Sequence, residues 1–112
     1  MGELSNIGVE KDFPERRPRN ISHRGMNVVV VKIDGSLFAF ENNCPHQHFS
    51  VLHEGTLEGC SLTCPMHGWT FDLKSGNSTN GSGKLRMIEV KASEGSVWVG
   101  SVKNELNFSL FD

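Results

Sequence analysis

Two short segments, each pairing a cysteine with a histidine, constrain this chain more than any other feature of its sequence. The first reads Cys44-Pro45-His46, and the second reads Cys64-Pro65-Met66-His67-Gly68-Trp69. Seventeen residues separate the two, so the spacing is C-x-H-x17-C-x2-H. Cysteine thiolates and histidine imidazoles are ligands of zinc and of iron–sulfur clusters. Each segment has proline after its cysteine and follows an expected strand, which predicts a metal centre held from both sides.

The distribution of ligands between the two segments separates two kinds of metal centre. Structural zinc sites usually place two cysteines in one pair and two histidines in the other. Here each pair is mixed, which suits a cluster with two cysteines on one iron and two histidines on the other. A zinc-stapled interaction module is the alternative. The visible spectrum separates the two, because a zinc protein is colourless.

The rest of the sequence predicts short β-strands joined by tight turns. A β-branched run over 28–33 precedes Asp34-Gly35 and a second apolar run over 36–40, which is a strong hairpin signal. Residues 11–24 contain two prolines and predict an irregular lead-in with at most one short strand. The class is therefore all-β, a sandwich or small barrel. The other expected strands cover residues 56–57, 61–63, 69–73, 85–91 and 96–102.

Within this strand pattern, the two Cys/His segments resemble the two cluster-binding boxes of Rieske 2Fe–2S proteins. The likeness extends to residues 34–40 before the first box, to 69–73 after the second, and to a closing hairpin over 85–99. The resemblance implies a Rieske-like antiparallel β-sandwich with a small cluster-binding subdomain at one end. It covers most of the chain, from about residue 25 to residue 100.

The resemblance also implies which residues hold the cofactor, one Rieske-type 2Fe–2S cluster. Its binding loops would span about residues 44–49 and 64–69. Cys44 and Cys64 would bind the inner iron, and His46 and His67 would bind the outer, solvent-facing iron.

The chain departs from the family pattern at several positions. Respiratory-chain and photosynthetic members carry two more cysteines, where this chain has Phe49 and Met66, so we expect no disulfide between the loops. Cys60 is expected to be a small, buried or half-buried hydrophobe. Residues 77–83 lack the proline common in the family's third loop, so we expect a more exposed or mobile cover for the cluster. The histidines outside the boxes are expected to be solvated: His23, His48 and His53.

Length and composition bound the class further. A chain of 112 residues fits one domain, and we assign residues 1–112 to a single Rieske domain. With 11 basic and 13 acidic residues, the net charge of -2 argues against nucleic-acid binding. No apolar run is long enough for a membrane helix, and no secretory signal opens the chain. The odd, low count of three cysteines favours a cytoplasmic protein, which we expect to be a monomer.

These features predict an electron carrier rather than an enzyme. The sequence has no G-x-G-x-x-G nucleotide motif, and outside the boxes no 2-His-1-carboxylate set is apparent. The resemblance implies a ferredoxin component that takes one electron from a flavin-dependent NAD(P)H reductase and gives it to a terminal oxygenase through transient contacts. The alternative is the small Rieske subunit of an assimilatory NAD(P)H nitrite reductase. High-potential family members place Ser and Tyr hydroxyls where this chain has Trp69 and Phe71, so a low reduction potential is expected.

Overall fold

The computed structural model describes residues 4–43, 51–65, 68–81 and 83–103, and within them it contains nine strands and two short 3-10 helices. The elements are β1 (Ser5–Val9), η1 (Glu10–Asp12), β2 (Arg19–His23), β3 (Met26–Ile33), β4 (Ser36–Glu41), η2 (Leu52–Glu54), β5 (Thr56–Glu58), β6 (Ser61–Thr63), β7 (Thr70–Asp72), β8 (Met87–Ser93) and β9 (Ser96–Val102).

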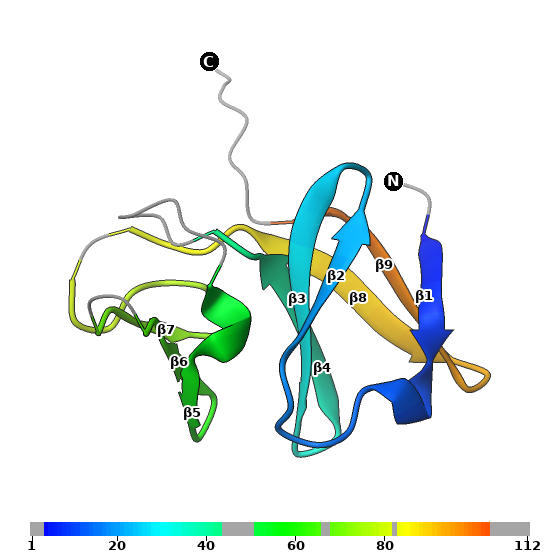
Figure 1. The fold of residues 1–112 in the computed structure, drawn as a ribbon, viewed down its shortest axis with the longest axis horizontal. Helices are drawn as coiled ribbons and strands as arrows, with labels where there is room; N and C mark the ends of the chain where they lie inside the picture. The colour runs from blue at the N-terminus through cyan, green and yellow to red at the C-terminus, as the bar shows by residue number, and fades with distance from the viewer. Residues whose placement is uncertain (1–3, 44–50, 66–67, 82, 104–112) are drawn as a thin grey trace.

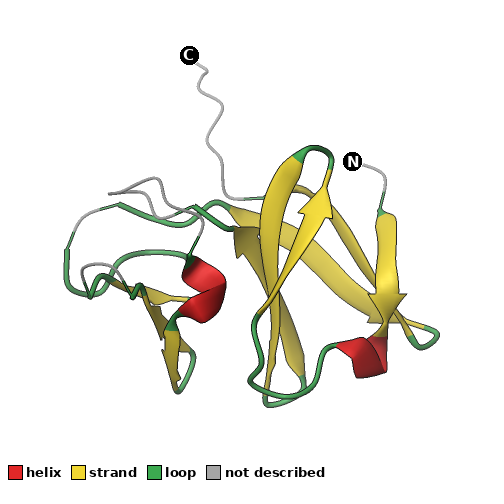
Figure 2. Cartoon of the chain, in the orientation of Figure 1, coloured by secondary structure: helices red, strands yellow, loops and turns green. Residues whose placement is uncertain are grey.

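The strands form a large sheet and a small sheet. The large sheet has the order β1-β9-β8-β4-β3-β2, the small sheet has the order β5-β6-β7, and all pairings between neighbouring strands are antiparallel. The small sheet lies to one side of the large one, with η2 beside it (Figures 1 and 2). The predicted all-β class is confirmed, and the small sheet is the subdomain expected at one end.

The large sheet folds back on itself, so that strands far apart in its order come together. His23, on the edge strand β2, uses its Nε2 to donate a hydrogen bond to the carbonyl of Gly100 on β9, at 3.0 Å. Phe13, from the lead-in, is 1% exposed and packs in the core that this sheet encloses. The large sheet is therefore a partly closed barrel with its own interior.

The hairpin of β3 and β4 forms where the Asp-Gly pair predicted it. Asp34 and Gly35 have φ angles of 52° and 82°, the left-handed conformations that a two-residue hairpin turn requires. The strands then pair from Ile33 opposite Ser36 as far as Val28 opposite Glu41. The turn thus fixes the register that aims each β3 side chain.

Strand β3 is buried on both faces, which explains its unbroken run of valines. Val28 and Val30 face the interior of the large sheet, where Phe13 packs. Val29 and Val31 face the opposite way, into a second core that the small sheet completes. A strand covered on both faces reads as a continuous apolar run rather than an alternating one.

The N-terminal strand β1 was not predicted from the sequence. It pairs with β9, and its register shifts between Asn6 and Gly8, where Gly8 has a φ of 141°. The lead-in before β3 contributes one strand, β2, as expected. Within the described residues, no helix is long and apolar enough to cross a membrane.

Two arginines of the lead-in have structural partners. Arg16 Nη1 donates to the carbonyl of Gly59 in the turn between β5 and β6, at 3.1 Å, which ties the lead-in to the small sheet. Arg19 Nη1 donates to the carbonyl of Asp12 at 2.9 Å, and its guanidinium lies 5.4 Å from the centre of the Phe13 ring.

Candidate metal centre

Of the four ligands implied by the sequence, the described residues include Cys64. Its side chain is 1% exposed and belongs to the core between the two sheets. It stands directly after β6 and forms no disulfide within the described residues. Cys44, His46 and His67 lie outside the described residues, as do Phe49 and Met66. The full ligand set therefore stays a prediction.

The first and last residues of the second ligand segment, residues 64–69, are joined by backbone hydrogen bonds. The N–H of Cys64 donates to the carbonyl of Trp69 at 2.7 Å, and the N–H of Gly68 donates to the carbonyl of Cys64 at 3.1 Å. Gly68 has a φ of 76°, a conformation that glycine adopts without strain. This closure fixes where the segment leaves β6 and where it enters β7.

The proline-free residues 77–83, here called the third segment, begin with backbone hydrogen bonds to β7. The N–H of Asp72 donates to the carbonyl of Asn77 at 2.9 Å, and the N–H of Thr79 donates to the carbonyl of Thr70 at 2.8 Å. Ser78 pairs with Phe71 between these bonds. Residues 77–79 thus lie as an additional paired segment along the edge of the small sheet at β7, with Asn77 and Thr79 exposed.

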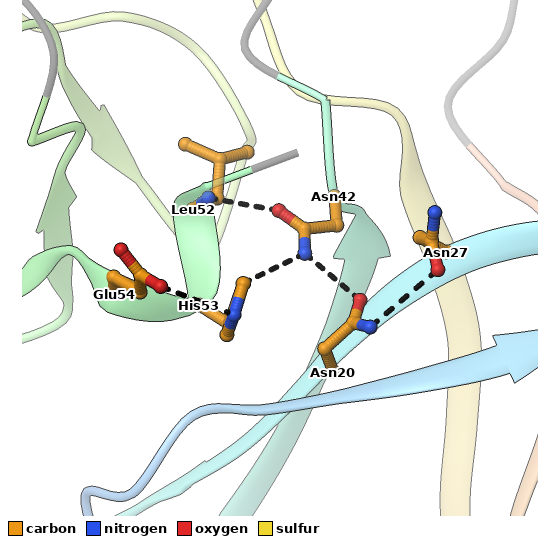
Figure 3. A network of polar contacts seen from close by, with 6 residues as sticks. All are labelled: Asn20, Asn27, Asn42, Leu52, His53 and Glu54. Atoms are coloured by element: carbon orange, nitrogen blue, oxygen red, sulfur yellow. Dashed lines mark hydrogen bonds and ion pairs between the residues drawn. The ribbon is translucent and has the colours of Figure 1, made fainter. Parts of the chain in front are cut away.

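A buried asparagine closes the first ligand segment (Figure 3). Asn42 is 1% exposed and precedes Cys44 by two residues. Its Oδ1 accepts a hydrogen bond from the N–H of Leu52 at 2.8 Å, beyond the segment. Its Nδ2 donates to Oδ1 of Asn20 at 2.8 Å and to Nδ1 of His53 at 2.9 Å. One carboxamide therefore joins the two ends of the segment and anchors both to β2.

Two of the histidines predicted to be solvated have structural partners instead. His23 is buried and bonded to β9, as described above. His53 is half-buried, accepts the bond from Asn42, and places its Nε2 3.7 Å from Oε2 of Glu54. The prediction was wrong for both. The partner of His23, Gly100, is distant in the sequence, and His53 meets Asn42 only where η2 packs against the end of β4. His48 lies outside the described residues.

Cys60 is half-buried and packs against the core between the two sheets, as predicted. Burial raises the pKa of its thiol, and the nearby ammonium of Lys74 opposes this shift. Neutral thiol is therefore favoured at this position. Within the described residues, no three His, Cys, Asp or Glu side chains come together as a metal site.

The positions expected to lower the reduction potential carry apolar rings. Phe71 is fully buried, and Trp69 is half-buried against the same core. Neither ring offers a hydroxyl, and the chain contains no tyrosine. The nearby threonine hydroxyls of Thr63 and Thr70 are bonded to each other at 2.8 Å.

The described residues fit the implied cluster. Cys64 is buried directly after β6, at the closed base of the second segment, and Asn42 closes the base of the first. The donor set in the sequence, two thiolates and two imidazoles in mixed pairs, is that of a Rieske centre.

Comparison with known proteins identifies the family. The sequence model of a protein family, described as "Rieske [2Fe-2S] domain", matches residues 4–91 of this chain. The chain therefore belongs to the Rieske [2Fe-2S] domain family, and its cofactor is one Rieske-type 2Fe–2S cluster rather than zinc.

The relatives include both small ferredoxins and larger oxygenases. Ferredoxin CarAc of Metapseudomonas resinovorans is 33% identical over 78 residues, which cover 68% of this chain and 72% of that protein. The 4beta-methylsterol monooxygenase of Methylococcus capsulatus is 29% identical over 105 residues, which cover 83% of this chain and 28% of that protein. The chain thus spans only part of each relative's length.

Solved structures show the same fold. A chain from the complex of reduced oxygenase and oxidized ferredoxin in carbazole 1,9a-dioxygenase superposes with a TM-score of 0.82 and 28% identity, covering 91% of this chain and 97% of that chain. A structure from Mycobacterium tuberculosis, named for the small subunit of an NADH-dependent nitrite reductase, gives a TM-score of 0.84 at 18% identity and covers 92% and 98%. At that identity, the second likeness shows the fold alone.

Sequence reasoning missed the residues that hold the ligand segments in place. Asn42 and the third segment act through hydrogen bonds to residues ten or more positions away or to a neighbouring strand. The available signals were an Asn-Asn pair just before Cys44 and an Asn-Gly pair inside the residues 75–83. Neither signal is specific without the fold.

Proposed function

We propose that this protein is a one-electron carrier, a ferredoxin that takes electrons from a flavin-dependent NAD(P)H reductase and passes them to a terminal oxygenase. The observation that carries the proposal is the Rieske domain match together with the likeness to ferredoxin CarAc, which covers 72% of that protein. The cluster supplies reversible one-electron chemistry when bound. The chain's own residues bond the described ends of the ligand loops, and the rings of Phe71 and Trp69 pack in the adjoining core. On this proposal the protein serves an oxygenase system without being an enzyme itself.

We further propose that Cys44, His46, Cys64 and His67 are the four ligands, and that residues 1–112 form a single domain. Cys64 supports the ligand set, because it is buried beside the core at the base of a closed loop. Docking would use the cluster end of the molecule, since electron transfer needs a short distance between redox centres. Such transient contacts bury less than about 1,200 Å² in total. A monomer in the cytoplasm is part of the same proposal.

Ligand variants test the assignment. Cys44→Ser and Cys64→Ser should abolish cluster assembly, and His46→Ala and His67→Ala should lose the cluster or alter its visible spectrum. Cys60→Ala is the matched control, because it removes a thiol from the same subdomain without removing a proposed ligand. A colourless Cys60→Ala protein, or a Cys44→Ser protein with full iron and sulfide content, would contradict the assignment.

A reduction assay tests the carrier role. Catalytic amounts of a flavin-containing ferredoxin reductase with NADH should reduce the purified protein and bleach its visible bands. Removal of one electron per chain by an oxidant should restore the original spectrum. The nitrite reductase alternative, favoured only by a likeness in fold, expects the chain to purify in a stable complex with a larger subunit. A chain that accepts electrons only within such a complex would refute the free carrier.

A further inference from the structure

The third segment reaches the second ligand loop through a side chain. Backbone pairing with β7 ends at Thr79, whose N–H donates to the carbonyl of Thr70. The next residue continues the contact with its carboxamide. Oδ1 of Asn80 accepts from the N–H of Thr70 at 3.0 Å, and Nδ2 of Asn80 donates to the carbonyl of Gly68 at 3.0 Å. Both bonds flank Trp69.

These two bonds have the pattern of strand pairing. A carboxamide offers the same donor and acceptor as a peptide group. In a parallel pair, a residue bonds on one strand to the N–H and the C=O of the two residues that flank its partner. Asn80 makes this pattern to Gly68 and Thr70 around Trp69. The side chain thereby extends the small sheet onto the ligand loop, where the backbone of the third segment no longer pairs with it.

The residue after Asn80 lies against the same tryptophan. A Cβ placed on Gly81 would fall 1.8 Å from a carbon of the Trp69 ring, so only a glycine backbone fits there without displacing the ring. The carbonyl of Trp69 in turn accepts from the N–H of Cys64 at 2.7 Å. A continuous series of contacts therefore runs from Asn80 and Gly81 through Trp69 to a proposed ligand.

We propose that Asn80 is a positioning residue for the second ligand loop. It holds residues 68–70 and so fixes the approach of the loop that carries Cys64 and His67. The inference rests on the proposed function, because it takes these two residues as cluster ligands. Asn80 is itself exposed, so its bonds contribute more to the geometry of the loop than to the stability of the fold.

The chain offers a matched control for a test of this role. Asn77 is also an exposed asparagine of the third segment, and its side chain makes no hydrogen bond within the described residues. Asn80→Ala should shift the midpoint of the purified holoprotein in a redox titration and alter its visible circular dichroism. Iron release to a chelator should rise about tenfold, which corresponds to about 1.4 kcal/mol. Asn77→Ala should match the wild type in all three measurements.

Hydrogen exchange supplies a readout at the site itself. In Asn80→Ala, the peptide that contains Thr70 should exchange faster, because that N–H loses its acceptor, whereas peptides from β3 and β4 should be unchanged. If Asn80→Ala does not hold a cluster, Asn80→Asp decides, since it keeps the acceptor for Thr70 and loses the donor to Gly68. It should then shift the midpoint further than Asn77→Asp, which adds the same charge.

The outcomes separate this inference from the proposed function. A wild-type protein that lacks iron would overturn both. A wild-type protein with its cluster, together with an Asn80→Ala variant that matches Asn77→Ala in midpoint, spectrum and iron release, would overturn the positioning role alone. An Asn80→Asp midpoint equal to that of Asn77→Asp would do the same.

Discussion

Removing the carboxamide of Asn42 should destabilise the whole protein, because this side chain joins the two ends of the first ligand segment to each other and to β2 of the large sheet. In Asn42→Ala, the N–H of Leu52 loses its acceptor inside the core, where Leu52 is fully buried. An unpaired buried donor costs about 1–3 kcal/mol. Asn20 is exposed and His53 is half-buried, so water can replace their bonds at a lower cost.

The expected loss is therefore about 2–3 kcal/mol, a large part of the roughly 5–15 kcal/mol by which a domain is stable. For a chain of this size, 1 kcal/mol lowers the melting temperature by about 4–8 °C, so we expect a fall of roughly 10–20 °C. The measurement is anaerobic thermal unfolding of the holoprotein, followed by far-ultraviolet circular dichroism and by the visible bands of the cluster. Iron should be lost at a lower temperature as well, because the segment that Asn42 closes carries two proposed ligands.

Two further variants sharpen this test. Asn27→Ala is the control, since Asn27 is exposed and its side-chain Oδ1 accepts a long bond of 3.4 Å from Asn20 at the outer end of the network (Figure 3), while its backbone carbonyl, which accepts from the N–H of Asn42, is kept in the variant. Asn42→Asp keeps the acceptor for Leu52 and loses both donated bonds, so its stability should fall between the wild type and Asn42→Ala. The reasoning fails if Asn42→Ala unfolds within about 0.5 kcal/mol of Asn27→Ala, the scatter of ordinary surface changes.

Three other predictions address single residues, and a fourth addresses the reduction midpoint. Gly81→Val should displace the ring of Trp69 and change the tryptophan fluorescence, and an unchanged emission spectrum would contradict the close approach. Ser78→Ala should leave stability unchanged or raise it by about 1 kcal/mol in urea unfolding, because the Ser78 hydroxyl is buried without a hydrogen-bond partner in the described structure; a clear loss would reveal a partner. Since burial raises the pKa of the Cys60 thiol, iodoacetamide should label it slowly at pH 7 and faster as the pH rises through that pKa, as measured by mass spectrometry; labelling at pH 7 as fast as that of a free thiol would refute this. The reduction midpoint should lie near the low end of the roughly -150 to +300 mV span of Rieske centres, because Phe71 and Trp69 supply no hydroxyl, and a titrated midpoint above about +100 mV would refute this.

The parts of the fold that local chemistry determines could be predicted from the sequence. The residues Asp34 and Gly35 favour the left-handed conformations of a two-residue hairpin turn, and the β-branched run before them predicts a buried strand. Strand β1 could not be predicted, because Ser5–Val9 contains polar residues and a glycine and becomes a strand only by pairing with β9. Its partner lies some ninety residues further along the chain.

The candidate site likewise has one part that the sequence suggests and another part that only the fold shows. The proposed metal ligands are suggested by residue type and spacing, since few side chains bind iron, and this ligand set stays a prediction because Cys44, His46 and His67 lie outside the described residues. The groups that hold the ligand loops are asparagines, which are common in loops of every kind. Only the fold shows that Asn42 reaches Leu52 and that Asn80 reaches Gly68 and Thr70.

The use of neutral carboxamides at both ligand segments suits a centre whose charge changes during function. A charged side chain in the same place would favour one oxidation state over the other, whereas a carboxamide adds no net charge. A network that holds its groups in fixed positions also limits the rearrangement needed when the charge changes. Asn42 is buried and bonded at both its oxygen and its nitrogen, so its loss should affect stability first. Asn80 is exposed, and within the described residues its carboxamide bonds to Gly68 of the second loop and Thr70 of β7, so its loss should affect the midpoint first. Measured on both variants, the ratio of these two effects distinguishes an anchor of the fold from a device that positions the ligands.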